Sequence, residues 1–476
     1  MIKLKQHATL IFLLGLACLF RLPHLSGSLW LDEAAQALES SRPLADQYKI
    51  QDDFQPPLFH YLVHAEIQIS HSEAFLRLVS LFAGVVSVAL IYLLLKDVTS
   101  NRIATASAFF LSINPFHIFY SQELRPYAVA TMFACLSWYV LVAKWKKENK
   151  HVFWFILATV GGLYSMYLYP FVLLSQFIFI VFEKRYQLRS FLISSFISCL
   201  FFLPWLPFFI GQLHVGTSLT KDLPGWAQAV ATPQLKALPL TLAKFAVGQV
   251  ELKDSPMYVV LAAIFMLISL DAILWNFRKK ETRFLIYWFL VPLLGAWAIS
   301  FLIPVIQPKR VMIALPALVG MLGVFVADTG RFKQMREGAS IVIAILFLSM
   351  TSLYYTTPKY QRENWRDVIS QIQEQGKGEQ STTVFAFPEP LAPWRWYASG
   401  TVGSVSTGML HVDSVDQLKE PFRQLSGSTR IFVFDYLRDL TDPHHVIEQW
   451  LTASGYTQSG LIDGGNVGFV RVFDSR

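Results

Sequence analysis

The chain has 476 residues, of which 54% are hydrophobic and only 15% are charged, with a formal net charge of +7. Soluble globular proteins carry about a quarter charged residues, so this composition excludes an ordinary soluble protein. The basic residues stand in short clusters between apolar runs and form no interleaved basic and aromatic surface. That pattern is typical of membrane topology and argues against nucleic-acid binding.

Apolar runs of about 18 to 22 residues, the length at which a helix matches the hydrocarbon thickness of a bilayer, recur through the first three quarters of the chain. The predicted fold class is therefore a polytopic α-helical membrane protein. We expect about eleven transmembrane helices, at 7–24, 76–96, 102–121, 124–143, 151–169, 171–183, 190–210, 256–277, 284–304, 311–327 and 339–356.

Basic clusters predict the orientation. Lys3 and Lys5 precede the first span, and the clusters at 144–150, 183–189, 276–283 and 331–337 fall in alternate loops. By the positive-inside rule these loops face the cytoplasm. The N-terminus is then cytoplasmic, and an odd number of spans puts the C-terminal tail outside.

Two long loops are predicted on the outer face. In the first, 25–75, the stretches "DEAAQALESS" and "PPLFHYLVHAEIQIS" show apolar residues at helical spacing, and Pro57 suits a first helical turn. We expect helices lying at the interface. The second loop, 211–255, contains "LPGWAQAVATPQL" and could be partly re-entrant.

The composition changes at residue 356. The last part is polar and alternates helical with strand patterns, which predicts a small α/β domain on the outer face. We thus expect a membrane domain at 1–355 and an extracytoplasmic domain at 356–476, with helices at 364–375, 414–425 and 444–456 and strands at 381–390, 428–436 and 466–474.

The double acid Asp32–Glu33 lies just beyond the first span. One interpretation is structural, with Asp32 capping the helix that follows and Glu33 in its favourable first turn. The other is functional, because the pair lies where the head group of an amphiphilic substrate would sit.

A second constellation, "FYSQELRPYA" at 119–128, places Gln122, Glu123, Arg125 and Tyr127 between two apolar helices. Ionisable groups at membrane depth are costly and usually functional. Arg125 could hold a phosphate through its fork of donors, or it could form a structural ion pair with a carboxylate of the first loop.

Three further features are weaker. Asp53 precedes a Pro-Pro pair, and His60 follows it with a second histidine at i+4, a spacing that can hold a metal but more often marks a solvated or interfacial pair. Lys309 and Arg310 lie at the outer mouth of the tenth span, where interfacial snorkelling and phosphate contact are equally good interpretations.

Together these segments resemble the bacterial branch of the family 39 glycosyltransferases, relatives of the protein O-mannosyltransferases and the lipid A aminoarabinose transferase, which share the membrane-embedded GT-C fold. The resemblance rests on "SLWLDEA", on Asp53 with "PPLFHYL" and "SEAFLRL", and on "NPFHIFYSQELRPYA". It covers roughly the first 130 residues best and continues more weakly through "PKRVMIALPAL" and "NWRDV".

The resemblance implies that a sugar moves from a polyprenyl-phosphate donor to a glycan, lipid or protein acceptor on the outer face of a bacterial plasma membrane, with inversion. It makes Asp32 the catalytic carboxylate, with Glu33 beside it. Arg125 would stabilise the leaving phosphate, with Lys309 and Arg310 behind it, and Asp53, His60, Gln122, Glu123 and Tyr127 would line the pocket.

One position departs from the family. Relatives commonly carry His or Lys before the Pro-Pro pair, where this chain has Gln55. The departure removes a possible cationic or metal contact and leaves a divalent metal possible but open. No other cofactor is implied.

Two other functions compete. A lipid-linked sugar transporter or flippase would line its path with these charges, but the acids cluster in outer loops and no inverted repeat is evident. A non-catalytic membrane anchor for the C-terminal domain would leave the first-loop acids unexplained.

Overall fold

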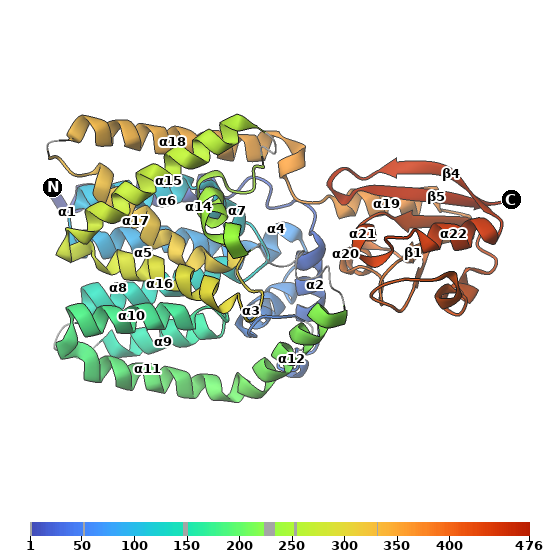
Figure 1. Cartoon of the computed structure of the whole chain (residues 1–476), viewed down its shortest axis with the longest axis horizontal. Helices are drawn as coiled ribbons and strands as arrows, with labels where there is room; N and C mark the ends of the chain where they lie inside the picture. The colour runs from blue at the N-terminus through green and yellow to red at the C-terminus, as the bar shows by residue number, and fades with distance from the viewer. Residues whose placement is uncertain (1, 51–52, 146–150, 223–233, 252–254, 331) are drawn as a thin grey trace. The chain divides into compact units, whose positions relative to one another are not determined.

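A computed structural model of the whole chain describes residues 2–50, 53–145, 151–222, 234–251, 255–330 and 332–476 (Figure 1). The re-entrant segment predicted around "LPGWAQAVATPQL" and most of the basic cluster at 144–150 lie outside the described residues. The chain divides into two compact units. The membrane unit comprises Met1–Leu25, Pro43–Thr217 and Gln228–Tyr360, and the C-terminal unit comprises Ser26–Arg42, Ser218–Ala227 and Gln361–Arg476.

The membrane unit is built from apolar helices that run alongside one another (Figure 1). Its interior lies around α17, in which every residue from Leu315 to Val326 is buried. The helices are α1 (Ile2–Leu19), α3 (Leu58–Ile67), α4 (Glu73–Leu76), α5 (Leu78–Val98), α6 (Asn101–Ile113), α7 (Pro115–Ser121), α8 (Tyr127–Tyr139), α9 (Val152–Leu163), α10 (Pro170–Glu183), α11 (Leu188–Phe202), α12 (Leu206–Asp222), α14 (Ala237–Val247), α15 (Pro256–Phe277), α16 (Phe284–Ile299), α17 (Leu315–Val326) and α18 (Lys333–Thr356).

Six helical segments of the described residues are long and apolar enough to cross a membrane, or seven if one bent pair counts as a single span. Four other predicted spans coincide with shorter apolar helices, at His7–Leu19, Val152–Leu163, Pro170–Glu183 and Phe284–Ile299. The polytopic helical class is confirmed, whereas the number eleven stays a prediction.

The bent pair, α6 and α7, has a local cause. Pro115 has no N–H to continue α6, and the two helices meet at 61°. The Asn114 side chain caps α7 by accepting from the His117 N–H at 2.9 Å and donates to the Phe245 carbonyl at 2.8 Å. The break turns the chain so that α7 leads directly into the Gln122–Pro126 turn.

A buried arginine satisfies the carbonyls that this break leaves without helical partners. Arg21, just after α1, is fully buried and donates to the Ser112 carbonyl at 3.0 Å and the Leu111 carbonyl at 3.2 Å. Its second terminal nitrogen also lies 2.7 Å from His117 Nδ1. A cation at the C-terminus of α6 is favourable for the helix dipole, so Arg21 joins α1 to the break that precedes the candidate site.

The C-terminal unit holds one five-stranded mixed sheet, with strand order β2-β1-β3-β5-β4. β1 pairs in parallel with β2 and β3, and β5 pairs antiparallel with β3 and β4. The strands are β1 (Ser381–Phe385), β2 (Gly403–Ser406), β3 (Arg430–Phe434), β4 (Tyr456–Asp463) and β5 (Phe469–Ser475). The helices are α2 (Leu31–Ser40), α19 (Trp365–Gln375), α20 (Ala392–Tyr397), α21 (Arg438–Thr441) and α22 (Val446–Ala453).

The predicted helix at 364–375 is confirmed by α19, and the three predicted strands correspond to β1, β3 and β5. The predicted helix at 414–425 is wrong, because this stretch forms two short 3₁₀ turns, the second of which begins at Pro421, a residue that cannot continue a helix. The largest difference concerns residues 26–42, which we grouped with the membrane domain and which fold with the C-terminal unit. Leu31 at the start of α2 packs on the apolar cluster that contains Trp365 and Phe434.

Candidate functional site

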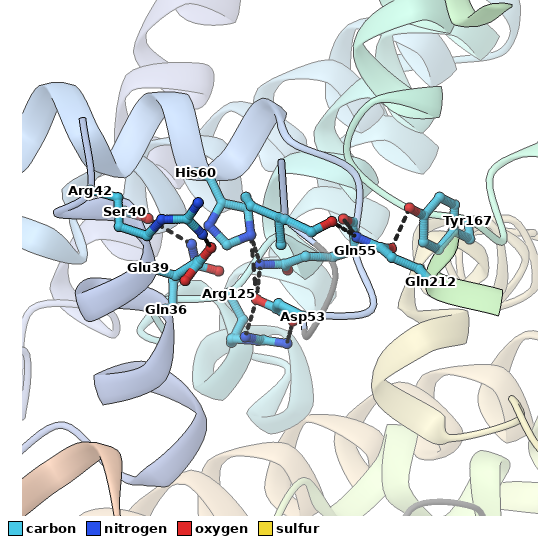
Figure 2. Close-up of polar contacts among 11 residues, drawn as sticks. Gln36, Glu39, Ser40, Arg42, Asp53, Gln55, His60, Arg125, Tyr167 and Gln212 are labelled. Atoms are coloured by element: carbon cyan, nitrogen blue, oxygen red, sulfur yellow. Dashed lines mark hydrogen bonds and ion pairs between the residues drawn. The ribbon is translucent and has the colours of Figure 1, made fainter. Parts of the chain in front are cut away.

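A carboxylate–guanidinium pair forms the centre of the candidate site in the membrane unit. Arg125 lies in the turn between α7 and α8, and Asp53 lies in the loop before α3. The two terminal nitrogens of Arg125 donate to different oxygens of Asp53, each at 3.3 Å (Figure 2). The Arg125 side chain is 13% exposed and that of Asp53 is 20% exposed. This two-pronged geometry is the preferred one for an arginine with a carboxylate.

The surroundings of Asp53 favour its ionised form. Burial alone would raise the pKa of the carboxyl, but the positive charge of Arg125 and the hydrogen bond from His60 outweigh burial and hold the pKa of Asp53 well below its ordinary value. Asp53 is therefore a carboxylate at neutral pH, and its pair with Arg125 is an ion pair.

Gln55 and His60 complete the surroundings of Asp53. Gln55 Nε2 donates to Asp53 Oδ2 at 2.6 Å and lies 2.8 Å from Nε2 of the fully buried His60. The same ring nitrogen lies 3.3 Å from Asp53 Oδ2. Gln55, the residue that departs from the family pattern, thus fills its position as an uncharged donor to the carboxylate.

This donor set does not fit a metal. Both oxygens of Asp53 already face Arg125, Gln55 and His60. Throughout the part of the chain that the structure describes, no group of three or more His, Cys, Asp or Glu side chains could hold a metal ion. The predicted His60–His64 pair is not assembled into such a group, and no step below is derived through a metal.

A polar network extends from this pair toward α12. Gln212 Nε2 donates to the Ile50 carbonyl at 2.9 Å, and its Oε1 accepts from the Tyr167 hydroxyl at 2.6 Å. The same hydroxyl accepts from the indole N–H of Trp205 at 3.0 Å. Gln212 and Tyr167 were not among the residues predicted from the sequence. Each is a polar side chain at the edge of an apolar run, which is the feature that could have indicated them.

The other predicted residues of the membrane unit lie on both sides of Arg125 in the chain. Gln122 and Glu123 are buried, and Gln122 donates to the Arg21 carbonyl at 3.1 Å, which ties this turn to the end of α1. Tyr127 begins α8, and its ring lies 5.7 Å from the Lys309 ammonium. The neighbouring Arg310 donates to the Val305 carbonyl at 3.2 Å.

The predicted acids Asp32 and Glu33 lie in the first turn of α2, in the C-terminal unit. The N-cap of α2 is Trp30, so Asp32 is the second helical residue and not the cap. Glu33 serves the helix end instead, because its fully buried carboxylate accepts from the Trp30 N–H at 3.4 Å. The expectation that Asp32 caps the helix is therefore wrong, whereas the expectation that Glu33 lies in its first turn is confirmed.

Comparison with known proteins adds three findings. Residues 54–210 match the family model described as dolichyl-phosphate-mannose-protein mannosyltransferase. The structure of ArnT from Cupriavidus metallidurans bound to undecaprenyl phosphate is similar, with a TM-score of 0.58 at 10% identity over 97% of both chains. The oligosaccharyltransferase of Archaeoglobus fulgidus, solved with a tethered acceptor peptide, gives a TM-score of 0.57 at 11% identity over 98% of this chain and 74% of that chain. A sequence search of curated proteins returned no significant match.

The family match includes Asp53's neighbours and Arg125, and the similar structures extend over nearly the whole chain. At this level of identity the structural matches establish the fold, and the family match adds the chemistry. Together they indicate that the chain is a membrane glycosyltransferase of the GT-C fold.

Proposed function

We propose that this glycosyltransferase transfers a sugar from a polyprenyl-phosphate donor to an acceptor on the extracytoplasmic face of a bacterial plasma membrane. The observation that carries the proposal is the ion pair between Asp53 and Arg125. Arg125 lies within the segment that matches the mannosyltransferase family model, and Asp53 lies one residue before that segment begins. The similar ArnT structure holds undecaprenyl phosphate, which supports a lipid phosphate as the donor's carrier. The acceptor class, whether glycan, lipid or protein, is left to experiment.

We propose Asp32 as the catalytic base. In the reaction its carboxylate would take the proton of the acceptor hydroxyl while that oxygen attacks the anomeric carbon of the sugar. The bond from the anomeric carbon to the phosphate oxygen breaks, its electron pair stays on the phosphate, and the sugar inverts. Asp32 lies in the first turn of α2, and Glu33 serves the helix end, so the structure assigns Asp32 no capping function that would compete with catalysis.

We propose that Arg125 stabilises the negative charge on the departing phosphate, with Lys309 and Arg310 as further cations. A guanidinium suits this task because it presents several donors to a phosphate in a fixed plane. Arg125 is held by Asp53, so its planar group is oriented before substrate binds. Asp53, His60, Gln122, Glu123 and Tyr127 would shape the pocket around it.

The proposed topology has eleven spans, with the N-terminus in the cytoplasm and the C-terminal unit outside. It rests on the alternating basic loops and on the helices that coincide with the predicted spans. Cysteine-accessibility labelling of loop positions in intact and opened cells tests it directly.

The activity test gives purified protein in nanodiscs a panel of radiolabelled polyprenyl-phosphate sugars. Release of polyprenyl phosphate by the wild type, and its loss in Asp32→Asn, is the expected result. Asp46→Asn is the matched control, since Asp46 lies in the same loop in an exposed pair with Lys49. Full activity of Asp32→Asn would refute the base assignment, and movement of intact glycolipid across the bilayer without release would favour a transporter.

A further inference from the structure

The segment that carries Asp32 forms hydrogen bonds with residues more than three hundred positions away in the chain. In the C-terminal unit, the Arg366 N–H donates to Ser28 Oγ at 3.1 Å, across 338 positions, and the Leu29 N–H donates to the Tyr397 hydroxyl at 2.8 Å, across 368 positions. Two hydrogen bonds from the C-terminal part of the chain thereby fix the residues that precede α2.

The Glu363 carboxylate lies at the N-terminal end of α2. Its carboxylate accepts from the Trp365 indole N–H at 2.6 Å and from the Tyr436 hydroxyl at 2.9 Å, and it also accepts from the backbone N–H of Leu31, the first residue of the helix. Trp365 is fully buried, and its ring lies 4.9 Å from that of Tyr436 in a T-shaped arrangement. The orientation of Glu363 is therefore fixed by rigid aromatic partners.

Arg362, the residue before Glu363, contacts Glu33, the acid next to Asp32. Arg362 is 7% exposed, and its Nε lies 3.9 Å from Oε2 of the fully buried Glu33. Two successive residues of the C-terminal segment, Arg362 and Glu363, thus engage Glu33 and Leu31, the two neighbours of Asp32. The one acid between these two contacts is the proposed base.

The charges around Glu363 are close enough to interact. The ionisable groups facing it are Asp32 and Tyr436, with Glu33 and its partner Arg362 beside them. Burial raises the pKa of Glu363 and the negative charge of Asp32 raises it further, while the three hydrogen bonds oppose the rise. The Glu363 carboxyl group therefore lies close enough to Asp32 for their charges to interact.

We propose that Glu363 is a positioning residue for Asp32: it fixes the first turn of α2 and places a second carboxyl group beside the base. Residues from the far end of the chain, and not only the segment that carries Asp32, then take part in catalysis. This inference rests on the proposed role of Asp32.

The test uses the full-length protein in nanodiscs with the donor found active above. Glu363→Gln keeps the size of the side chain and removes its charge. Its amide oxygen can still accept from Trp365 or Leu31, and its NH₂ group can donate to the Tyr436 hydroxyl in place of accepting from it. We expect kcat to fall about tenfold with KM for the donor within about twofold, because positioning acts on the chemical step.

Tyr436→Phe is the second variant, because it keeps Glu363 charged and removes only one of its fixed donors. We expect a smaller fall in kcat and faster amide hydrogen exchange at Leu31–Glu33. The matched control is Tyr456→Phe, which removes another hydroxyl of the same unit, one that donates to the Ser428 carbonyl at 2.9 Å. It should change neither kcat nor exchange in α2.

The outcomes separate the two proposals. If Asp32→Asn retains activity, the base assignment fails and the role of Glu363 fails with it. If Asp32→Asn is inactive while Glu363→Gln keeps the wild-type kcat, only the role of Glu363 is overturned. Equal losses in Tyr436→Phe and Tyr456→Phe would also overturn it, because they would show a general effect of destabilising the unit.

Discussion

Arg125 meets Asp53 with both ends of its guanidinium, one terminal nitrogen on each carboxylate oxygen at 3.3 Å. The sequence left two interpretations of Arg125 open, an ion pair with a first-loop carboxylate or a phosphate contact, and the structure shows the ion pair. The two interpretations are compatible, because an arginine oriented by a carboxylate can still present an edge to an anion.

Arg125→Lys should separate charge from geometry. A lysine keeps the positive charge but cannot span both oxygens of Asp53 or offer a planar fork to a phosphate. We expect kcat to fall about a hundredfold to a thousandfold, as when a preorganised donor to a developing oxyanion is removed. Steady-state transfer assays measure this fall in kcat. Arg102→Lys is the control, because Arg102 is an exposed residue of α6. Wild-type rates in Arg125→Lys would show that a point charge is sufficient.

Asp53→Asn should lower stability in a pH-dependent way. The pKa of Asp53 is lowered in the folded protein, so its contribution is present above its ordinary pKa of about 4 and is lost as pH falls through the folded value. At neutral pH we expect a loss of about 1–3 kcal/mol for this partly buried pair. Thermal unfolding in detergent, followed from pH 7 down to about pH 2, is the measurement. A gap between variant and wild type that stays constant on acidification would contradict the argument.

Glu66→Gln should have the opposite dependence on pH. Burial raises the pKa of Glu66 to about 8, and the hydrogen bond from the Val79 N–H only partly offsets this. A raised carboxyl pKa means that the contribution to stability is present below the ordinary value and is lost as pH rises toward about 8. We therefore expect the melting temperature of the wild type to fall between pH 6 and pH 9 relative to that of Glu66→Gln. Glu281→Gln, at an exposed position, is the control and should follow the wild type.

Gly84→Ala should disturb the approach of α5 to α7. A Cβ at Gly84 would lie 2.1 Å from Ser121 Oγ and 3.3 Å from Arg21 Nε, so α7 would have to move away from α5. Overpacking of this kind costs about 1–3 kcal/mol, and here it would also shift the turn that carries Arg125. Gly15→Ala is the matched control, because no atom lies within 4 Å of its added Cβ. Thermal unfolding and transfer rate, measured on the same samples, should both fall only in Gly84→Ala.

Much of the fold could be predicted because apolar length and periodicity report directly on membrane helices. The limits were local. Pro115 bends one predicted span, and β4 was missed because this edge strand is exposed along most of its length and lacks a clean alternation. The helix predicted at 414–425 failed at Pro421, where chain geometry overrides the apolar spacing.

The site was harder to predict because its contacts connect distant parts of the chain. Sequence singled out Asp53, His60 and Arg125 as separate candidates, and the structure brings these three together. It could not indicate that Gln212, 157 positions from Gln55, donates to the Gln55 carbonyl. Nor could it indicate that α2 folds with the C-terminal unit, since the apolar face of α2 is equally suited to a membrane surface.

That membership of α2 has a consequence for biosynthesis. Tyr397, which accepts from the Leu29 N–H, is translated 368 residues after it. At about 5–20 residues per second, the segment around Asp32 waits roughly 20 to 70 seconds before its partners leave the ribosome. During this time the membrane helices can insert, but the proposed base has no folded support. A nascent or truncated enzyme would therefore be unable to cleave its lipid-linked sugar donor, and only a finished chain would become active.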